Sequence, residues 1–265
     1  MEKSLEEQLA AARRENEELR RALEECRAAR ERAEQDLERS HEEARAATQD
    51  MQHLIYAVSH DLRTPLRAVA SYTQLLQQQY ASNPEASELS TFAAQGVKEM
   101  NTLIEDLLKY SRAGNSPRRT NVRLNSVVQW AAINVQSLLR GASGEIIFDD
   151  LPEVNIDESQ FVQLFVQLFT NAINYRGETT LRIEVNAEET DAAYIISVRD
   201  NGIGIDPEYL ETIFQPFKRL QGKTIPGNGL GLAVCRKIVR AHGGRIWAES
   251  AGKGQGSVFK FSLPF

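Results

Sequence analysis

The stretch Gly227-Asn228-Gly229-Leu230-Gly231-Leu232 (GNGLGL) alternates glycine with other residues and opens a helical pattern that runs to about Ala241. Alternating glycines let backbone amides approach a ligand closely, and the N-terminus of a following helix favours phosphate oxygens. Taken alone, such a loop is more often a turn than a nucleotide site. The choice between a turn and a phosphate-binding loop therefore depends on the surrounding sequence.

Two further glycine-rich stretches accompany the first one. Asp200-Asn201-Gly202-Ile203-Gly204-Ile205 (DNGIGI) directly follows a strand-like run, and Gly252-Lys253-Gly254-Gln255-Gly256 stands before the last strand-like run. Around them, β-branched and aromatic runs indicate strands, and apolar periodicity indicates helices. The mixture predicts an α/β sandwich over residues 117–265. Its helices are expected over about 124–139 and 158–174, and its strands at 146–148, 181–185, 194–198, 245–248 and 258–263.

The helix expected over 158–174 carries polar residues that suit a metal–phosphate site. Gln167 and Asn171 are four residues apart and therefore share one helix face, and Asn174 lies one turn further on. Side-chain oxygens on such a face suit Mg²⁺, which keeps several waters and bridges substrate phosphates. For an isolated helix, a merely polar surface would be the better explanation.

Residues 51–116 have an all-helical pattern. One amphipathic run reaches about Tyr80, the stretch 82–87 (SNPEAS) breaks it, and a second run continues to the stretch 113–117 (AGNSP). Two antiparallel helices per chain would form a four-helix bundle in a dimer.

The first 50 residues contain no glycine or proline and repeat apolar residues in steps of three and four. This heptad pattern predicts a parallel coiled coil. Asn16 falls at an a position, where a buried Asn fixes the register of a dimer, and Cys26 falls at a d position. A lone helix stabilised by its charges is the alternative.

The stretch AVSHDLRTPL, at 57–66, places a histidine and an acid on this helical run, with a proline five residues after the histidine. The heptad puts Val58 at a and His60 at c, so we expect His60 to face water. Pro65 lacks the amide that would bond the carbonyl of Asp61, so the helix should bend beside His60. The alternatives are a phosphorylation site and an incidental kink in a solvated helix.

The composition of the whole chain limits its function. The 265 residues have room for one or two domains, and a hydrophobic share of 42% fits a folded protein. The net charge of −6 argues against an extended nucleic-acid-binding or basic membrane-binding surface. Because there is no apolar run of about 18 residues and no signal-peptide core, we expect a cytoplasmic protein without a membrane span. Two cysteines and four histidines argue against a transition-metal enzyme.

Residues 50–265 resemble a bacterial sensor histidine kinase of two-component systems. Five stretches carry the resemblance, in the family's order and at family-like spacing: SHDLRTPL (59–66) resembles the phosphoacceptor box, NAINY (171–175) the N box, DNGIGID (200–206) the first glycine box, FQPF (214–217) the F box and GNGLGLAV (227–234) the second glycine box. FKRL (217–220) and HGGRIW (242–247) further resemble kinases linked to phytochromes or PAS sensors.

The resemblance implies three domains. They are a coiled-coil signalling helix at 1–50, a dimerisation and histidine-phosphotransfer domain at 51–116, and a catalytic ATP-binding α/β domain of the Bergerat (GHKL) type at 117–265. It also implies a homodimer that works with a response regulator and with an upstream sensor domain or protein, and that binds no nucleic acid.

In the phosphotransfer domain, the resemblance implies that His60 attacks the γ-phosphate of ATP and that the phosphoryl group then passes to an aspartate of the regulator. Asp61 would orient or deprotonate the imidazole, a role worth about 10²–10⁴-fold in rate when the acid is well placed. Thr64 would position water when the kinase dephosphorylates its partner. Simple exposed polarity is the alternative explanation of Thr64.

In the ATP-binding domain, the resemblance assigns Asn171 to Mg²⁺ and Asp200 to the adenine amino group. Tyr175 would lie against the base, and Gly202 and Gly204 match glycines of the base pocket. The residues that match the hinge and the phosphate-facing end of a mobile lid are Gly227, Gly229, Gly231 and Leu232.

The resemblance also assigns three cations, and two positions of this sequence differ from the family's pattern. Arg219 resembles a cation that reaches the transferring phosphate, with Lys218 and Arg176 as helpers. Gln167 stands where the N box often has an Asn, and it would still reach Mg²⁺ through water. Asn174 stands where a Lys is common, which removes a phosphate-facing charge and bears on ATP affinity and autokinase rate.

Two other functions fit parts of the sequence. A GHKL ATPase of the gyrase, mismatch-repair or chaperone kind would use ATP to close a dimer, but the acceptor box and the heptads argue against it. A weak or inactive kinase that acts as a dimeric scaffold is favoured only if ATP does not bind.

Overall fold

The computed structural model describes residues 27, 30, 34–36, 38–40, 42, 50–52, 54–220, 225 and 227–265. Contacts divide the chain into two compact units, Met1–Leu54 and Ile55–Phe265. The coiled coil predicted for 1–50, with Asn16 and Cys26, lies outside the described residues except at scattered helical positions. At two of these, Arg30 donates to the Glu34 carboxylate across one turn at 2.7 Å.

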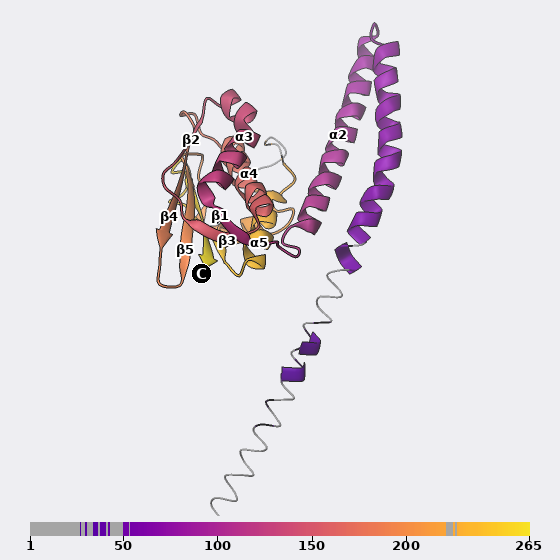
Figure 1. Cartoon of the computed structure of the whole chain (residues 1–265). Coiled ribbons are helices and arrows are strands. Elements are labelled where there is room, and N and C mark those ends of the chain that lie inside the picture. Colours follow the sequence, from indigo (N-terminus) through magenta and orange to yellow (C-terminus); the bar gives the residue numbers. More distant parts are fainter. Residues whose placement is uncertain are drawn as a thin grey trace, which may run out of the picture. The chain divides into compact units, whose positions relative to one another are not determined.

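A helical hairpin opens the second unit (Figure 1). Residues 54–79 are helical, and α2 (Pro84–Arg112) follows a short turn. Asn83 caps α2, because its side chain accepts the Ala86 N–H. The break predicted at 82–87 is therefore confirmed. The first helix continues through Pro65, and the bend beside His60 stays a prediction.

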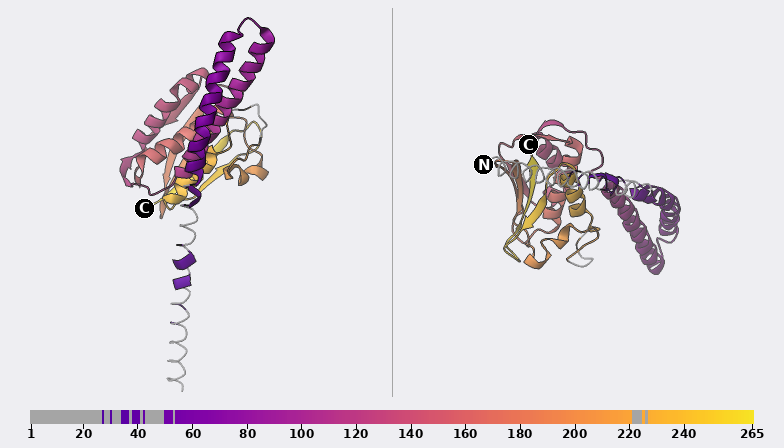
Figure 2. Two further views of the ribbon diagram at one scale, coloured as in Figure 1. Left: turned by 90° about the vertical axis from the view of Figure 1, so that its right-hand side faces the viewer. Right: turned by 90° about the horizontal axis from the view of Figure 1, so that it is seen from below.

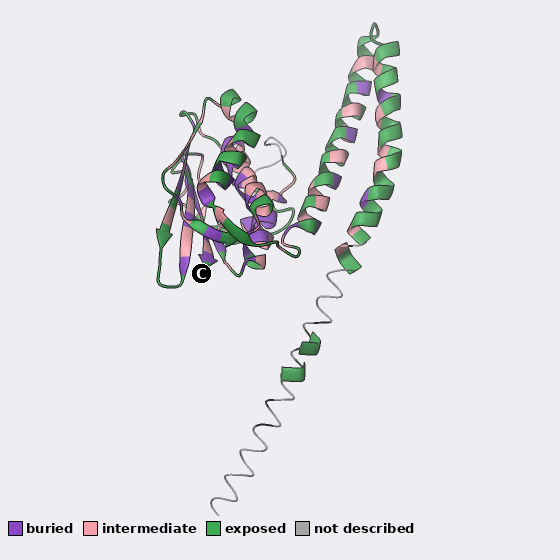
Figure 3. Cartoon of the chain, in the orientation of Figure 1, coloured by how far each residue is buried: buried purple, intermediate pink, exposed green. Residues whose placement is uncertain are grey.

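Few residues of the two hairpin helices are buried, and most are exposed or intermediate (Figure 3). The buried residues are Ser59, Thr73, Ser90, Val97, Ile104 and Ser111. Thr73 satisfies its buried hydroxyl locally, because the hydroxyl bonds the carbonyls of Val69 and Ala70. Exposed apolar stripes run beside the buried seam at helical spacing. They comprise Val58, Leu62, Val69, Tyr72 and Leu76 on the first helix and Leu89, Phe92, Met100 and Leu103 on α2.

The rest of the chain is an α/β domain in which helices cover one face of a sheet, as the views in Figures 1 and 2 agree. The helices are α3 (Leu124–Gly141), α4 (Glu158–Asn174) and α5 (Gly231–Ala241). The sheet has five strands in the order β2-β4-β5-β7-β6. Their bounds are β2 (Glu145–Phe148), β4 (Arg182–Glu189), β5 (Ala193–Asp200), β6 (Ile246–Glu249) and β7 (Ser257–Pro264).

The register of the sheet places the end of β5 beside the start of β7. β2 pairs with β4 in parallel, and the other neighbours pair antiparallel. Asp200, the last residue of β5, lies opposite Ser257. A separate two-stranded sheet joins β1 (Thr120–Arg123) to β3 (Glu153–Ile156), and two short 3₁₀ turns follow β5 at Pro207–Tyr209 and Thr212–Phe214.

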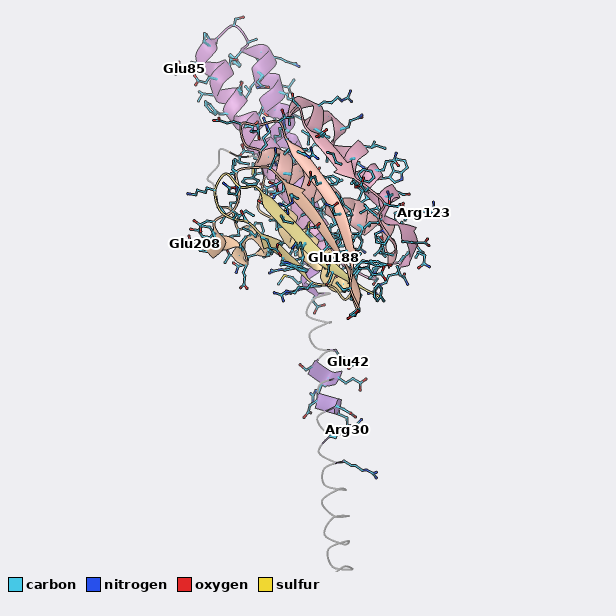
Figure 4. All side chains as sticks on the ribbon, turned by 90° about the vertical axis from the view of Figure 1, so that its left-hand side faces the viewer. Arg30, Glu42, Glu85, Arg123, Glu188 and Glu208 are labelled. Carbon is cyan, nitrogen blue, oxygen red and sulfur yellow. The ribbon has the colours of Figure 1, made fainter. Side chains whose placement is uncertain are left out.

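The core of the α/β domain lies between the helices and the sheet. Phe161, Phe165 and Phe169 of α4 pack with Phe259 and Phe261 of β7, and all five are almost completely buried. Charged side chains labelled in Figure 4, such as Arg123, Glu188 and Glu208, lie on the surface.

The predicted fold class, a helical hairpin followed by an α/β domain, is confirmed. Every predicted strand and helix of residues 117–265 is present, whereas β1 and β3 were not predicted. Among the helices in the part of the chain that the structure describes, none is long and apolar enough to cross a membrane.

Candidate functional site

A cavity of about 400 Å³ opens where α4, the end of β5 and the start of α5 meet. Most of the residues that the sequence assigned to a nucleotide and its metal line this cavity. They are Gln167, Asn171, Tyr175, Asp200, Gly204, Lys218, Arg219, Gly227, Gly229, Gly231 and Leu232. Segments that lie up to 65 positions apart in the sequence, from Gln167 to Leu232, thus meet at one site.

The α4 wall of the cavity is set by the cap of that helix. Asp157 accepts the Gln160 N–H and so fixes where α4 begins. One turn apart on α4, Gln167 and Asn171 both line the cavity. A Cβ at position 231 would lie 2.5 Å from Oε1 of Gln167, so a side chain there would make the end of Gln167 shift.

Asp200 is a buried carboxylate at the end of β5, with 8% of its surface exposed. Its oxygens accept the backbone amides of Gly202, at 2.8 Å, and Ser257. Burial raises the pKa of Asp200, and the two amide hydrogen bonds oppose that rise. A carboxylate held in this way presents its remaining acceptor capacity to the cavity, where an amino group would match it.

The predicted glycine Gly202 does not line the cavity. A Cβ there would lie 2.5 Å from the Tyr175 carbonyl oxygen and 2.7 Å from Oδ1 of Asp200. Because Gly202 has no Cβ, the backbone of Tyr175 and the side chain of Asp200, which both line the cavity, can lie close to it. Gly204 does line the cavity, has φ +74°, and would clash with the Gly252 carbonyl if it carried a Cβ.

The glycine-rich stretch 252–256 supports the stretch 200–205. The amide of Gly254 donates to the Ile203 carbonyl at 2.7 Å, and that of Gly256 donates to the Gly202 carbonyl at 3.1 Å. A Cβ at Gly256 would lie 2.1 Å from the Asp200 carbonyl oxygen. This stretch packs beneath the loop that carries Asp200.

A backbone hydrogen bond joins Phe217, the last residue of the F box, to Gly229, two residues before α5. The Phe217 amide donates to the Gly229 carbonyl at 3.0 Å, and a Cβ at Gly229 would lie 2.8 Å from the Lys218 carbonyl oxygen. Phe217 itself has φ +61°, which is rare for a bulky residue. Lys218 and Arg219 line the cavity, and the Arg219 guanidinium donates to the Ile225 carbonyl.

Arg176 is the predicted helper that the cavity does not include. Its guanidinium donates to the Ile173 carbonyl at 3.1 Å, near the C-terminal end of α4. There it satisfies a helix carbonyl that has no partner within the helix.

Two residues of α2 line the cavity although the sequence did not assign them. Asp106 accepts the side-chain amide of Asn228 at 2.9 Å, and Lys109 lies one turn further along α2. No local motif marks either residue, and α2 lies about sixty positions before the N box in the chain. Only their position three residues apart on an amphipathic helix could have linked them to each other.

The predicted phosphoacceptor lies on the first hairpin helix. Nδ1 of His60 is 3.2 Å from Oδ1 of Asp61, and the two side chains are 69% and 83% exposed. The residue before them, Ser59, is buried instead. Thr64 is exposed as well, and none of His60, Asp61 and Thr64 is among the described residues that line the cavity.

A proton on Nδ1 of His60 would leave a nucleophilic nitrogen. If Nδ1–H donates to the Asp61 carboxylate, Nε2 carries the lone pair of the neutral imidazole. Exposure of the ring makes that lone pair accessible.

Two family models match these two parts of the chain. The His Kinase A (phospho-acceptor) domain matches residues 50–116, and the histidine kinase-, DNA gyrase B- and HSP90-like ATPase domain matches residues 156–265. The chain belongs to the two-component histidine kinases. Its exposed His60 lies within the first match, and its cavity-lining motifs lie within the second.

Curated relatives of this histidine kinase are longer proteins. Cyanobacterial phytochrome A of Nostoc sp. is 39% identical over 219 residues, which cover 81% of this chain and 28% of the relative. The sensor histidine kinase WalK of Bacillus subtilis is 32% identical over 229 residues, which cover 82% of this chain and 37% of the relative. The chain thus spans about a third of the length of these relatives.

Solved structures share the fold of this histidine kinase. Full-length ShkA, in complex with AMPPNP, matches with a TM-score of 0.63 at 24% identity, over 80% of this chain and 46% of that one. The histidine kinase ThkA, in complex with the response regulator protein TrrA, matches with a TM-score of 0.56 at 25% identity, over 80% of this chain and 61% of that one.

Proposed function

We propose that this histidine kinase binds ATP in the cavity between α4 and α5, phosphorylates its own His60 and passes the phosphoryl group to an aspartate of a response regulator. One observation carries the proposal. Asn171, Asp200 and the lid glycines line one cavity, while the same chain exposes an imidazole bonded to a carboxylate at His60.

The cavity offers complementary groups to each part of ATP. Asp200 would accept the amino group of adenine, and Tyr175 would lie against the base. The N-terminus of α5, at Gly231, favours phosphate oxygens. Lys218 and Arg219 would stabilise the charge of the transferring phosphoryl group.

The α4 wall fits Mg²⁺. Side-chain oxygens of Gln167 and Asn171 line the cavity, and Mg²⁺ is commonly held by one or two protein oxygens together with waters and phosphates. Among the described residues no cluster of three or more His, Cys, Asp or Glu forms an all-protein metal cage, which agrees with that mode of binding. When bound, Mg²⁺ would neutralise charge on the phosphate oxygens.

The reaction at His60 follows from its hydrogen bond. The Nε2 lone pair attacks the γ-phosphorus, a P–N bond forms, and the bond from the γ-phosphorus to the bridging oxygen breaks, so that its electron pair leaves with ADP. Asp61 stabilises the positive charge that develops on the imidazole and holds the proton at Nδ1.

Transfer to the regulator reverses the change at the ring. A carboxylate oxygen of the regulator attacks phosphorus, and the electron pair of the P–N bond returns to Nε2. The ThkA–TrrA complex supports such a partner. Thr64, one turn after His60 and exposed, would position water for hydrolysis of the regulator's phosphoaspartate.

We propose a homodimer as the active form, with the domain limits 1–50, 51–116 and 117–265. The exposed apolar stripes on both hairpin helices support this proposal, because a second hairpin would cover them and complete a four-helix bundle. The sensor that controls the kinase would act through residues 1–50.

Incubation with radiolabelled ATP and Mg²⁺ tests the function. The chain should acquire phosphate that is labile in acid and stable in base, and His60→Gln should abolish it because no nucleophile remains. His53→Gln, the same change seven residues earlier, is the matched control and should label normally. Label that survives in the His60→Gln variant would contradict the assignment, and release of free phosphate without a labelled chain would favour a GHKL ATPase.

A further inference from the structure

The hairpin helix α2 contributes charged side chains to the cavity of the α/β domain. Asp106 and Lys109 are three residues apart and both line the cavity. The Lys109 ammonium is 3.4 Å from Oδ1 of Asp106, and the Lys109 side chain is 53% exposed.

Hydrogen bonds within the second compact unit hold this end of α2 at the cavity. The Asn228 side-chain amide donates to Oδ2 of Asp106 at 2.9 Å, and Asn228 stands between the lid glycines. The Lys237 ammonium of α5 donates to the carbonyls of Tyr110 and Ser111, at 2.9 and 3.3 Å. Lys237 thereby satisfies carbonyls in the last turn of α2, directly after Lys109.

Close backbone packing fixes the same place. A Cβ at Gly114 would lie 2.7 Å from the Lys237 carbonyl oxygen, and Gly114 has φ +73°. Glycine therefore lets the chain leave α2 while its last turn stays against α5. The backbone that carries Lys109 is held from both sides, at Asp106 and at Gly114.

The charges of the residues that line the cavity suggest a phosphate-binding role for Lys109. Among the described residues that line it, the cations are Lys109, Lys218 and Arg219, the carboxylates are Asp106 and Asp200, and α4 contributes the neutral amide of Asn174. A bound triphosphate carries several negative charges. Because α4, which the structure describes throughout, supplies no cation to the cavity, these charges need cations from other elements.

Lys109 is able to supply one of these charges. Its contact with Asp106 is long, at 3.4 Å, and partly exposed, so this ion pair is weak. The ammonium also has three donors, so it can bond a phosphate oxygen and keep Asp106 as a partner.

We propose that Lys109 contacts the phosphates of the bound nucleotide, so that the phosphoacceptor hairpin itself supplies part of the ATP site. This inference rests on the proposed function. Asp106 positions Lys109 and at the same time bonds the lid residue Asn228. Occupation of the phosphate region is thereby coupled to the hairpin that carries His60.

Calorimetric titration of the full chain with AMPPNP, ADP and adenosine, each with Mg²⁺, tests the role of Lys109. Lys109→Gln should weaken AMPPNP binding by about three- to tenfold, because it removes one partly exposed charge–phosphate contact. Adenosine binding should not change, since adenosine has no phosphate. Lys109→Arg should restore the affinity for AMPPNP, and added salt should narrow the gap between Lys109→Gln and the unaltered chain.

The matched control is Lys98→Gln, which removes the same charge from the same helix three turns earlier and does not line the cavity. It should bind AMPPNP like the unaltered chain. Equal AMPPNP affinity in Lys109→Gln and Lys98→Gln would overturn the role of Lys109 alone. An equal loss for adenosine and AMPPNP in Lys109→Gln would also overturn it, because that result indicates a structural effect. Absence of AMPPNP binding by the unaltered chain would overturn the proposed function as well.

Discussion

The α/β domain and the hairpin differ in how far their large apolar side chains are buried. Phe161 and Phe165 of the domain are 0% exposed, whereas Phe92 and Leu103 of the hairpin are 68% and 40% exposed. The buried seam of the hairpin consists mostly of Ser and Thr side chains, with Val97 and Ile104 as its aliphatic members. Because burial of apolar surface is the main driving force of folding, the domain completes its core within one chain and the hairpin does not. The contrast agrees with the proposed dimer, in which a second hairpin would cover these exposed side chains.

The largest expected effect tests the self-sufficient core. Phe165→Ala removes a fully buried ring that packs against Phe169 and Phe261, and should lower the free energy of unfolding by about 3–5 kcal/mol. Urea unfolding followed by near-UV circular dichroism measures the change. Trp130→Ala, at a side chain that is 55% exposed, is the control and should stay within about 0.5 kcal/mol.

If a second hairpin packs on the exposed apolar stripe of α2, Leu103 lies in the dimer interface. Leu103→Ala should then weaken the dimer by about 2–3 kcal/mol, which is roughly a 30- to 150-fold rise in the dissociation constant. Sedimentation equilibrium measures it. Leu138→Ala, at a side chain of α3 that is 52% exposed, should leave the dissociation constant unchanged. Equal behaviour of the two variants would remove the contrast between hairpin and domain.

A pair of glycines compares packing in the two regions directly. Gly244→Ala would place a Cβ 1.9 Å from the Ser262 carbonyl oxygen, and should destabilise the domain by about 1–3 kcal/mol. Gly96, in the middle of α2, has open space around its Cβ position. Gly96→Ala should stabilise a lone hairpin by roughly 0.5–1 kcal/mol, because alanine favours the helix. Thermal unfolding at two protein concentrations checks both, and a loss for Gly96→Ala only at high concentration would place a partner helix there.

The smallest effect concerns pH and the domain alone. His242 is 4% exposed; its Nδ1–H donates to the Ile238 carbonyl, and its Nε2 accepts the Asp157 N–H. Burial lowers the pKa of His242 and Arg119 lowers it further, while the Ile238 hydrogen bond and the Asp157 charge oppose the shift. The folded form therefore binds a proton at His242 less well than the unfolded chain does. The contribution of His242 to the free energy of unfolding is fully present above the ordinary histidine pKa and is lost as the pH falls below about 6.5.

Denaturant unfolding of the domain between pH 8 and pH 5 measures that slope. His242→Gln should be less stable at pH 8 and should flatten the dependence, since no imidazole remains to be protonated. An unchanged slope would assign the dependence to other groups.

Local pattern located most elements of the domain because each carries its own signal. The helix expected over about 158–174 coincides with α4 (Glu158–Asn174). β1 and β3 were missed because neither has the consecutive apolar residues that marked the equally short β2 and β6: TNVR contains one apolar residue, and EVNI contains two that are not adjacent. Their pairing joins Thr120 to Ile156, a partnership that no local pattern encodes.

The candidate site was predictable where motifs carry the chemistry. Asn171, Asp200 and the lid glycines were assigned from the sequence and line the cavity, although their roles stay proposals. Arg176 was assigned by the same reasoning and lies elsewhere, because its long side chain bonds the end of its own helix. Side-chain direction over such a length depends on the partners that the fold supplies.

The sequence by itself determined most of the helices and strands, the glycine loops, and which histidine has an acidic neighbour, since these depend on residues a few positions apart. Only the tertiary structure decided the strand order β2-β4-β5-β7-β6, the packing of the 252–256 loop beneath Asp200, and the arrival of Lys109 at the cavity. These depend on backbone approach and on hydrogen bonds between segments far apart in the chain. Such contacts form when the whole core packs, and no short stretch of sequence contains them.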